Sequence, residues 1–181
     1  MSVSAVIKIK PYEKVIQVTR HHLITFIPQI IFFILLTLVP IALYWLLQRL
    51  FPTLFLNSII YPLDILLASI FYLSILLFFY TSFVEFYLDL WIFTNDRLVD
   101  VEQTTLFARR IAEADLYQVQ DVSSEVKGFC ASLFNYGRVE IQTAGAVPKF
   151  ILENVPHPHQ LRQTILELAS EDKKFHNHNN K

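Results

Sequence analysis

Charged side chains are absent from two long stretches of this 181-residue sequence. No acidic or basic residue occurs from Leu23 to Gln48 or from Ile65 to Val84, although such residues make up 17% of the chain. A transmembrane helix needs about 20 predominantly apolar residues, and both stretches meet that length. Neither shows a polar face, which argues against a buried helix of a soluble protein. We therefore expect two transmembrane helices, joined as a hairpin within residues 23–84.

Cysteine is nearly absent as well. Cys130 is the only one, so the chain forms no intramolecular disulfide, which is compatible with a reducing compartment. The first apolar stretch is too long for the apolar region of a signal peptide, and no Ala-x-Ala-type cleavage site follows it. It contains Pro28 and Pro40, which predict a kink, or a helix that starts near Pro28.

Basic residues are unevenly placed around the two stretches. The connecting loop carries only Arg49, whereas the N-terminal flank carries Lys8, Lys10, Lys14 and Arg20. The positive-inside rule then places the N-terminus in the cytoplasm, and two spans return the chain to the same side. We expect residues 1–22 to be a cytoplasmic or interfacial segment whose lysines Lys8, Lys10 and Lys14 contact lipid headgroups.

The motifs that carry common chemistries are missing. The sequence has no Gly-x-Ser-x-Gly elbow, no His-Glu-x-x-His, no cysteine pair and no glycine-rich phosphate loop. Neither apolar stretch has an ionisable residue at its middle, where a transporter or channel usually needs one. We expect no catalytic residue, no metal and no cofactor. Cys130 is predicted to lie in an apolar core, and Asp96, Asp100 and Glu102 on a solvated face.

A change of pattern from residue 85 onward predicts a soluble β-domain over residues 85–170. In "WIFTNDRLVDVE" (91–102), apolar residues alternate with polar ones around an Asn-Asp turn, which is typical of a β-hairpin. Period-two alternation of varying clarity predicts further strands at 105–113, 117–126, 138–143 and 149–155.

Two helices are expected in this domain. Apolar spacing predicts a short helix at 129–134, which Gly137 can end in the left-handed conformation. Leu161, Ile165 and Leu168 form one apolar stripe of an amphipathic helix over 157–171. The glycines, all beyond residue 127, flank predicted turns and suggest positive φ. The polar residues 171–181 are expected to be a disordered tail.

Four segments resemble the bacterial membrane-anchored pleckstrin-homology-like family. They are "FTNDRLVDVE", "RRIAEADLYQVQDVSSEVKG", "LFNYGRVEIQTAG" and "LENVPHPHQLRQTI". The chain departs from the family at Ala114-Asp115-Leu116, where an Ile-Pro-Leu step is common. The resemblance implies an α+β membrane protein in the bacterial cytoplasmic membrane. Its transmembrane hairpin would be followed by a small β-barrel, capped by the C-terminal helix.

Charge limits what this domain could bind. The part from Glu85 onward carries 14 acidic and 10 basic residues, a net charge of −4, whereas anionic lipids attract basic clusters. The only candidates for a phosphate or partner contact are Arg109, Arg110, Lys127 and Arg138. The first hypothesis is a non-catalytic, membrane-anchored scaffold that binds a protein partner or copies of itself. The alternatives are an anionic-lipid or bilayer sensor, and a subunit of a transport or enzyme complex. Nucleic acid is not an expected partner.

Overall fold

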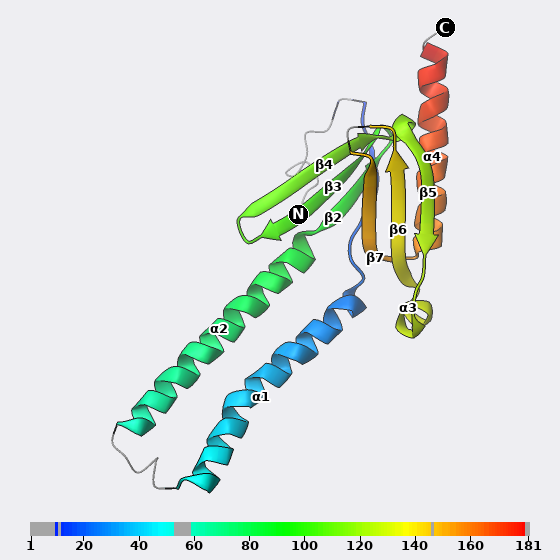
Figure 1. Cartoon of the computed structure of the whole chain (residues 1–181). Helices are drawn as coiled ribbons and strands as arrows, with labels where there is room; N and C mark the ends of the chain where they lie inside the picture. Colours follow the sequence, from blue (N-terminus) through cyan, green and yellow to red (C-terminus); the bar gives the residue numbers. More distant parts are fainter. Residues whose placement is uncertain (1–9, 11, 53–58, 146, 180–181) are drawn as a thin grey trace. The chain divides into compact units, whose positions relative to one another are not determined.

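The chain folds into two compact units. The computed structural model describes residues 10, 12–52, 59–145 and 147–179, with backbone alone for 175–179 (Figure 1). One unit is Thr25–Val84, and the other combines Met1–Ile24 with Glu85–Lys181. The segment before the helical hairpin thus belongs to the same unit as the strands after it, in addition to the expected residues 85–170.

The first unit is a pair of long helices. A 3-10 turn, Leu23–Phe26, leads into α1 (Ile27–Leu50), and α2 spans Ile60–Leu88. Pro28 lies in the first turn of α1, which confirms the predicted start there and leaves Pro40 inside the helix. The rings of Phe33 and Phe79 join the two helices edge to face at 5.4 Å.

Apolar side chains cover both helices on all sides. Among the described residues of Thr25–Val84, only Phe26 and Ile75 are buried. At about 1.5 Å per residue, helices of 24 and 29 residues exceed the ~30 Å of a hydrocarbon core. Both are therefore long and apolar enough to cross a membrane.

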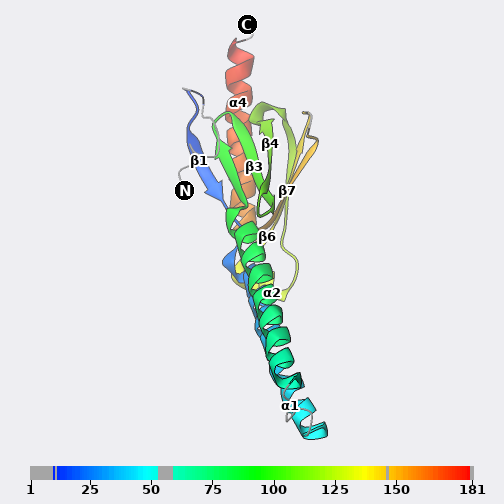
Figure 2. The ribbon, with the colours of Figure 1, turned by 90° about the vertical axis from the view of Figure 1, so that its left-hand side faces the viewer.

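The second unit begins with a four-stranded antiparallel sheet in the order β1-β2-β3-β4. Its strands are β1 (Val15–Thr19), β2 (Leu90–Thr94), β3 (Arg97–Thr105) and β4 (Ala108–Asp115). The predicted hairpin at 91–102 is confirmed as β2 and β3, with Ile92 opposite Val99. β1, which Figure 2 shows at one edge, was not predicted: its Val18 pairs with Ile92, across the inserted helical hairpin.

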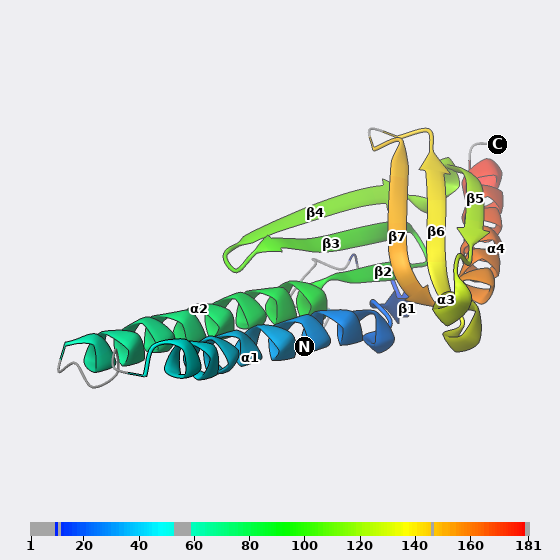
Figure 3. The same cartoon turned by 60° about the horizontal axis from the view of Figure 1, so that its bottom comes forward.

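A second sheet follows, in the order β5-β6-β7. The departing step Ala114-Asp115-Leu116 ends β4 and starts a 3-10 turn, Leu116–Gln118, which leads into β5 (Val119–Glu125). The short helix α3 (Phe129–Phe134) precedes β6 (Tyr136–Thr143) and β7 (Lys149–Pro156). Helix α4 (Pro158–Asn179) packs along this sheet with its predicted stripe of Leu161, Ile165 and Leu168 buried (Figure 3).

The two sheets do not close into the expected barrel. On the inner face of β3, the buried Leu98 is followed by Asp100 and Glu102, which pair with Ala112 and Arg110 of β4. Charged side chains lose hydration when sheets pack face to face, so burial of Asp100 and Glu102 would oppose closure here. The core instead gathers Phe93 and Leu98 with the second sheet and α4.

Two expectations about local structure were wrong. Residues 171–179 are not part of a disordered tail, because α4 continues to Asn179 and the buried Asp172 accepts a hydrogen bond from the Tyr117 backbone N–H; residues 180–181 lie outside the described part of the chain. Nor does Gly137 end α3: Asn135 takes the left-handed position, with φ of 51°. Gly137 lies in β6, where a Cβ atom would collide with the backbone carbonyl of Glu125.

Candidate functional site

A cleft of about 450 Å³ opens where the sheets diverge. Both terminal strands that flank it, β4 and β7, contribute to its walls. Acidic groups outnumber basic ones there: Asp89, Asp100, Glu102 and Glu153 face His21, Arg110 and Lys149. The cleft is thus a mixed-charge surface of acidic balance between two strand edges.

Asp100 is the most perturbed of these carboxyl groups. Its pKa is raised to about 6, first by burial and then by the neighbouring charges of Glu102 and Asp89. Arg110 and a hydrogen bond from Trp91 act in the opposite direction. The expectation that Asp100 lies on a solvated face was wrong, because it faces the second sheet across the cleft.

The raised pKa of Asp100 predicts a pH-dependent stability. The folded chain binds the carboxyl proton of Asp100 more tightly than the unfolded chain. Ionised Asp100 therefore lowers the stability of the fold above pH 6, and this penalty disappears as pH falls from about 6 toward 4. Asp100→Asn should therefore raise the unfolding free energy at pH 7.5 by on the order of 1 to 2 kcal/mol, since water screens part of the full effect. Near pH 4 the variant and the wild type should unfold alike in urea. An equal gain at both pH values would contradict this origin.

His21 and Asp89 mark the two places where the chain passes between the units. The His21 Nε2 lies 3.5 Å from Asp89 Oδ2, and its ring meets Trp91 edge to face at 4.9 Å. Asp89 also accepts a hydrogen bond of 2.6 Å from the Gln103 backbone N–H. The residues before α1 and after α2 are thus held side by side at one wall of the cleft.

The four predicted phosphate contacts do not form one cluster. Arg110 lies in the cleft, 4.0 Å from Glu102, while Arg109 is exposed on β4. Lys127 and Arg138 line a second, smaller cleft of about 250 Å³ next to α3, shared with the acidic Glu125 and Glu153. In it the Nε of Arg138 is buried and has no hydrogen-bond partner among the described residues.

Two of the N-terminal lysines, Lys10 and Lys14, contact the turn between β2 and β3. Lys10 forms an ion pair of 2.5 Å with Asp96 in the β2–β3 turn, which raises the lysine pKa. Lys14 donates its backbone N–H to the Asn95 side chain. Lys8 lies outside the described residues. These contacts fasten the segment before β1 to the turn that Asn95 and Asp96 were predicted to form.

A buried ion pair in the same region escaped the sequence analysis. The side chain of Glu13 is 0% exposed, and Arg97 reaches both its oxygens, at 2.8 and 2.9 Å. Burial alone would raise the pKa of Glu13, but hydrogen bonds from Arg97 and the Lys10 backbone outweigh it and leave the pKa below its usual value. The two residues are 84 positions apart, so no local pattern links them.

The described cysteine, serine and histidine side chains with nucleophilic potential do not gather in either cleft. Cys130 is exposed on α3, which corrects its expected place in the core. Ser124 Oγ lies 2.9 Å from His159 Nδ1, but neither residue lines the two clefts. Within the described part of the chain, no group of three or more metal-ligating side chains converges.

Comparison with known proteins adds one likeness. No family model matches the chain, and no curated protein matches it. Among solved structures, it is similar to a DUF1696 family protein with a pleckstrin-homology domain from Shewanella loihica PV-4. The identity is 15% and the TM-score 0.37, over 45% of this chain and 70% of that one.

Proposed function

We propose that this protein is a non-catalytic, membrane-anchored interaction module of the bacterial pleckstrin-homology-like kind. The helical hairpin anchors it in the cytoplasmic membrane, with both termini in the cytoplasm. The cleft between the sheets receives an extended segment of a protein partner that carries basic side chains. The observation that carries this proposal is the cleft itself, because the end strands of both sheets border it beside an excess of carboxylates.

Membrane anchorage is supported by the exposure of the two helices. Apolar patches on soluble monomers rarely exceed a few hundred square ångströms, whereas both of these helices are apolar on every side. The cytoplasmic orientation follows from the basic residues that precede α1 and their scarcity between the helices. Confinement to a surface also raises the effective concentration of the domain for a partner there.

Partner binding is supported by the strands that border the cleft. An extended peptide gains backbone hydrogen bonds by adding to an exposed sheet edge, and side-chain contacts supply the specificity. β4 ends the first sheet and β7 ends the second, so an end strand borders either wall of the cleft. Glu102 and Glu153 are exposed at the cleft, where they can meet lysine or arginine of an arriving segment.

The test is site-specific cross-linking of the full-length protein in its native membrane. A photoreactive residue replaces Arg110, which is 70% exposed in the cleft. We expect one adduct of defined mass, reduced several-fold by Glu102→Lys with Glu153→Lys, because reversed charge repels a basic segment. The matched control, Glu167→Lys with Glu171→Lys on α4, should leave the adduct unchanged. The proposal would be overturned if no adduct forms, or if its yield is the same with and without the charge reversals in the cleft.

Lipid sensing is the second candidate, and the cleft next to α3 favours it. Lys127 and Arg138 supply two positive charges there, and the buried Arg138 Nε leaves a donor for an anionic group. Glu125 opposes this, because it already forms an ion pair of 2.6 Å with Lys127. This acidic neighbour makes the protein-binding function the better supported of the two.

A further inference from the structure

The apolar side chains that the β-domain leaves most exposed are concentrated in three places. Among the described residues of the second unit, the Phe, Leu, Ile and Val side chains more than 60% exposed are Leu23 (77%), Phe107 (98%), Phe129 (83%) and Leu133 (63%). Leu23 begins the first candidate span, so a bilayer accounts for its exposure. The other three lie at the β3–β4 turn and on α3, and need a separate explanation.

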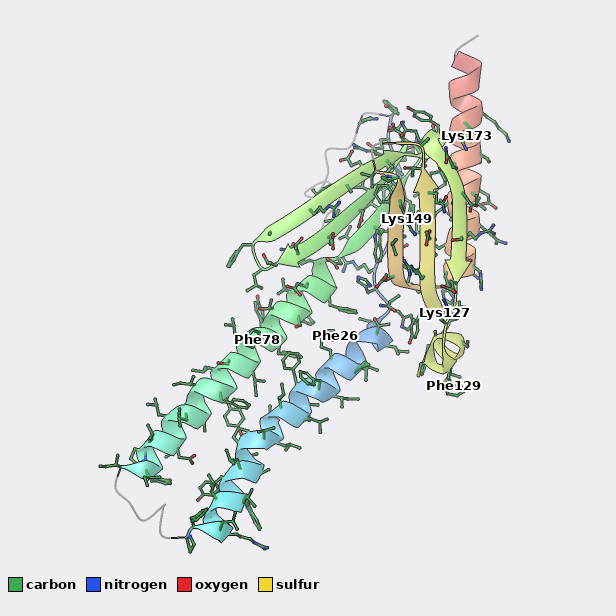
Figure 4. All side chains as sticks on the ribbon, in the orientation of Figure 1. Phe26, Phe78, Lys127, Phe129, Lys149 and Lys173 are labelled. Atoms are coloured by element: carbon green, nitrogen blue, oxygen red, sulfur yellow. The ribbon has the colours of Figure 1, made fainter. Side chains whose placement is uncertain are left out.

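Helix α3 projects from the domain with little support. Of its six residues only Ala131 is buried, while Phe129, Leu133 and Phe134 are exposed. Figure 4 shows Phe129 beyond the strand ends of the second sheet, close to Lys127. A helix this short is unstable in water without tertiary contacts. Its exposed apolar surface therefore calls for a partner that covers it.

One hydrogen bond and one ring contact place α3 near the residues that lead from the domain into α1. The His22 backbone N–H donates to the Asn154 carbonyl at 2.7 Å. The His22 ring stacks on Tyr136, with ring centroids 5.5 Å apart. Tyr136 starts β6 only two residues after α3 ends, and His22 immediately precedes the first candidate span. The short helix thus lies beside one of the two connections to the hairpin.

Strand register places the β3–β4 turn next to the other connection. β2 starts at Leu90, directly after α2, and Leu90 pairs with Val101. β3 runs back past this level for four more residues, about 13 Å, before the turn that holds Phe107. The hydrogen bond from Gln103 to Asp89 keeps this extension beside the end of α2.

We propose that α3 and the β3–β4 turn are two membrane feet, which insert Phe129, Leu133 and Phe107 into the headgroup region of the bilayer. The occupant is the lipid surface that the hairpin enters, because both feet lie beside the chain's crossing points. Phe and Leu are typical of apolar faces that lie 5–10 Å into this boundary, and a nearby lysine such as Lys127 can remain at the headgroups. The inference rests on the proposed membrane anchorage and adds two further contacts between the domain and the membrane.

The native cysteine makes the proposal testable in the full-length protein. Cys130 is the only cysteine and is exposed on α3, so an environment-sensitive fluorophore can be attached without any substitution. In nanodiscs of neutral phosphatidylcholine, we expect a nitroxide attached to the lipid to quench the fluorescence of the Cys130 probe. Aqueous iodide should quench this probe at least twofold less than it quenches a control probe. The control probe is attached at Gln163→Cys in a chain that also carries Cys130→Ser. Gln163 is exposed on α4. Phe129→Ser with Leu133→Ser should restore iodide access at Cys130.

Each other outcome has a defined meaning. A probe at Ala108→Cys, next to Phe107, should show the same lipid quenching, and quenching at only one foot overturns the two-point contact. Protection from both quenchers means that protein, such as a second copy, covers α3, and also overturns it. Lipid quenching that requires anionic lipid and is lost in Arg138→Gln also overturns the proposal. A probe at Ser74→Cys in α2 tests the anchor alone: if lipid fails to quench it, the proposed membrane anchorage falls as well.

Discussion

Ile165→Asp should unfold the β-domain. Ile165 is completely buried where α4 packs on the second sheet, beside Leu161 and Leu168. A buried carboxylate without a partner costs several kcal/mol beyond the lost apolar contacts, which alone amount to about 2–5 kcal/mol. This sum approaches the whole stability of a typical domain, about 5–15 kcal/mol. Limited proteolysis of the full-length protein in nanodiscs should show the domain cut while the hairpin stays protected.

The same helix offers a matched control. Gln163 lies two residues before Ile165 and is exposed, so Gln163→Asp should leave the protease pattern unchanged. Reversal of both Arg109 and Arg110 to Glu should also leave the fold intact, because these side chains lie on an exposed strand. If Ile165→Asp, or the double variant with Leu161→Asp, resists protease as well as the wild type does, α4 is not part of the core.

Arg97→Ala should release the N-terminal strand from the sheet. The substitution leaves Glu13 buried with neither of its guanidinium hydrogen bonds. Removal of one member of a buried ion pair typically costs about 3–5 kcal/mol, since the other charge stays uncompensated. Hydrogen exchange should therefore become several hundred-fold faster at the β1 amides, Val15–Thr19, and less affected in β5–β7.

Two further measurements distinguish the buried Glu13–Arg97 pair from an exposed ion pair. Lys10→Ala removes a more exposed ion pair and should cost at most about 1 kcal/mol. Because the pKa of Glu13 lies below its usual value of 4.5, the pair stabilises the fold above that pH and loses its effect as pH falls through the folded value. The Arg97→Ala and wild-type chains should thus converge in acid. Equal exchange in β1 at neutral pH would show that Glu13 does not depend on Arg97.

Elements whose signal is local were predicted well. The two charge-free stretches became α1 and α2, the Asn-Asp turn joined β2 to β3, and the stripe at Leu161, Ile165 and Leu168 became the buried face of α4. In each case the spacing of apolar residues within one segment decides which face can be buried. Such patterns need no knowledge of the partner segment.

Local sequence patterns do not reveal a structure that depends on a distant segment of the chain. β1 has only five residues, and its alternation gains meaning only through Ile92 and its neighbours, which lie beyond the helical hairpin. Gly137 was assigned to a helix end because its requirement, close approach to the Glu125 carbonyl, comes from another strand. Cys130 was predicted to lie in the core, since apolar composition does not tell which side of a short helix has a neighbour.

The amino-acid sequence alone determined that two helices are apolar enough for a membrane and that a β-domain with a C-terminal helix accompanies them, because these properties depend on composition and short-range periodicity. Only the tertiary structure decided that the hairpin is inserted between two paired strands, that the sheets stay open around Asp100, and that Glu13 meets Arg97. These features depend on strand pairing across many residues, where the side chains of one segment set the burial and charge of another.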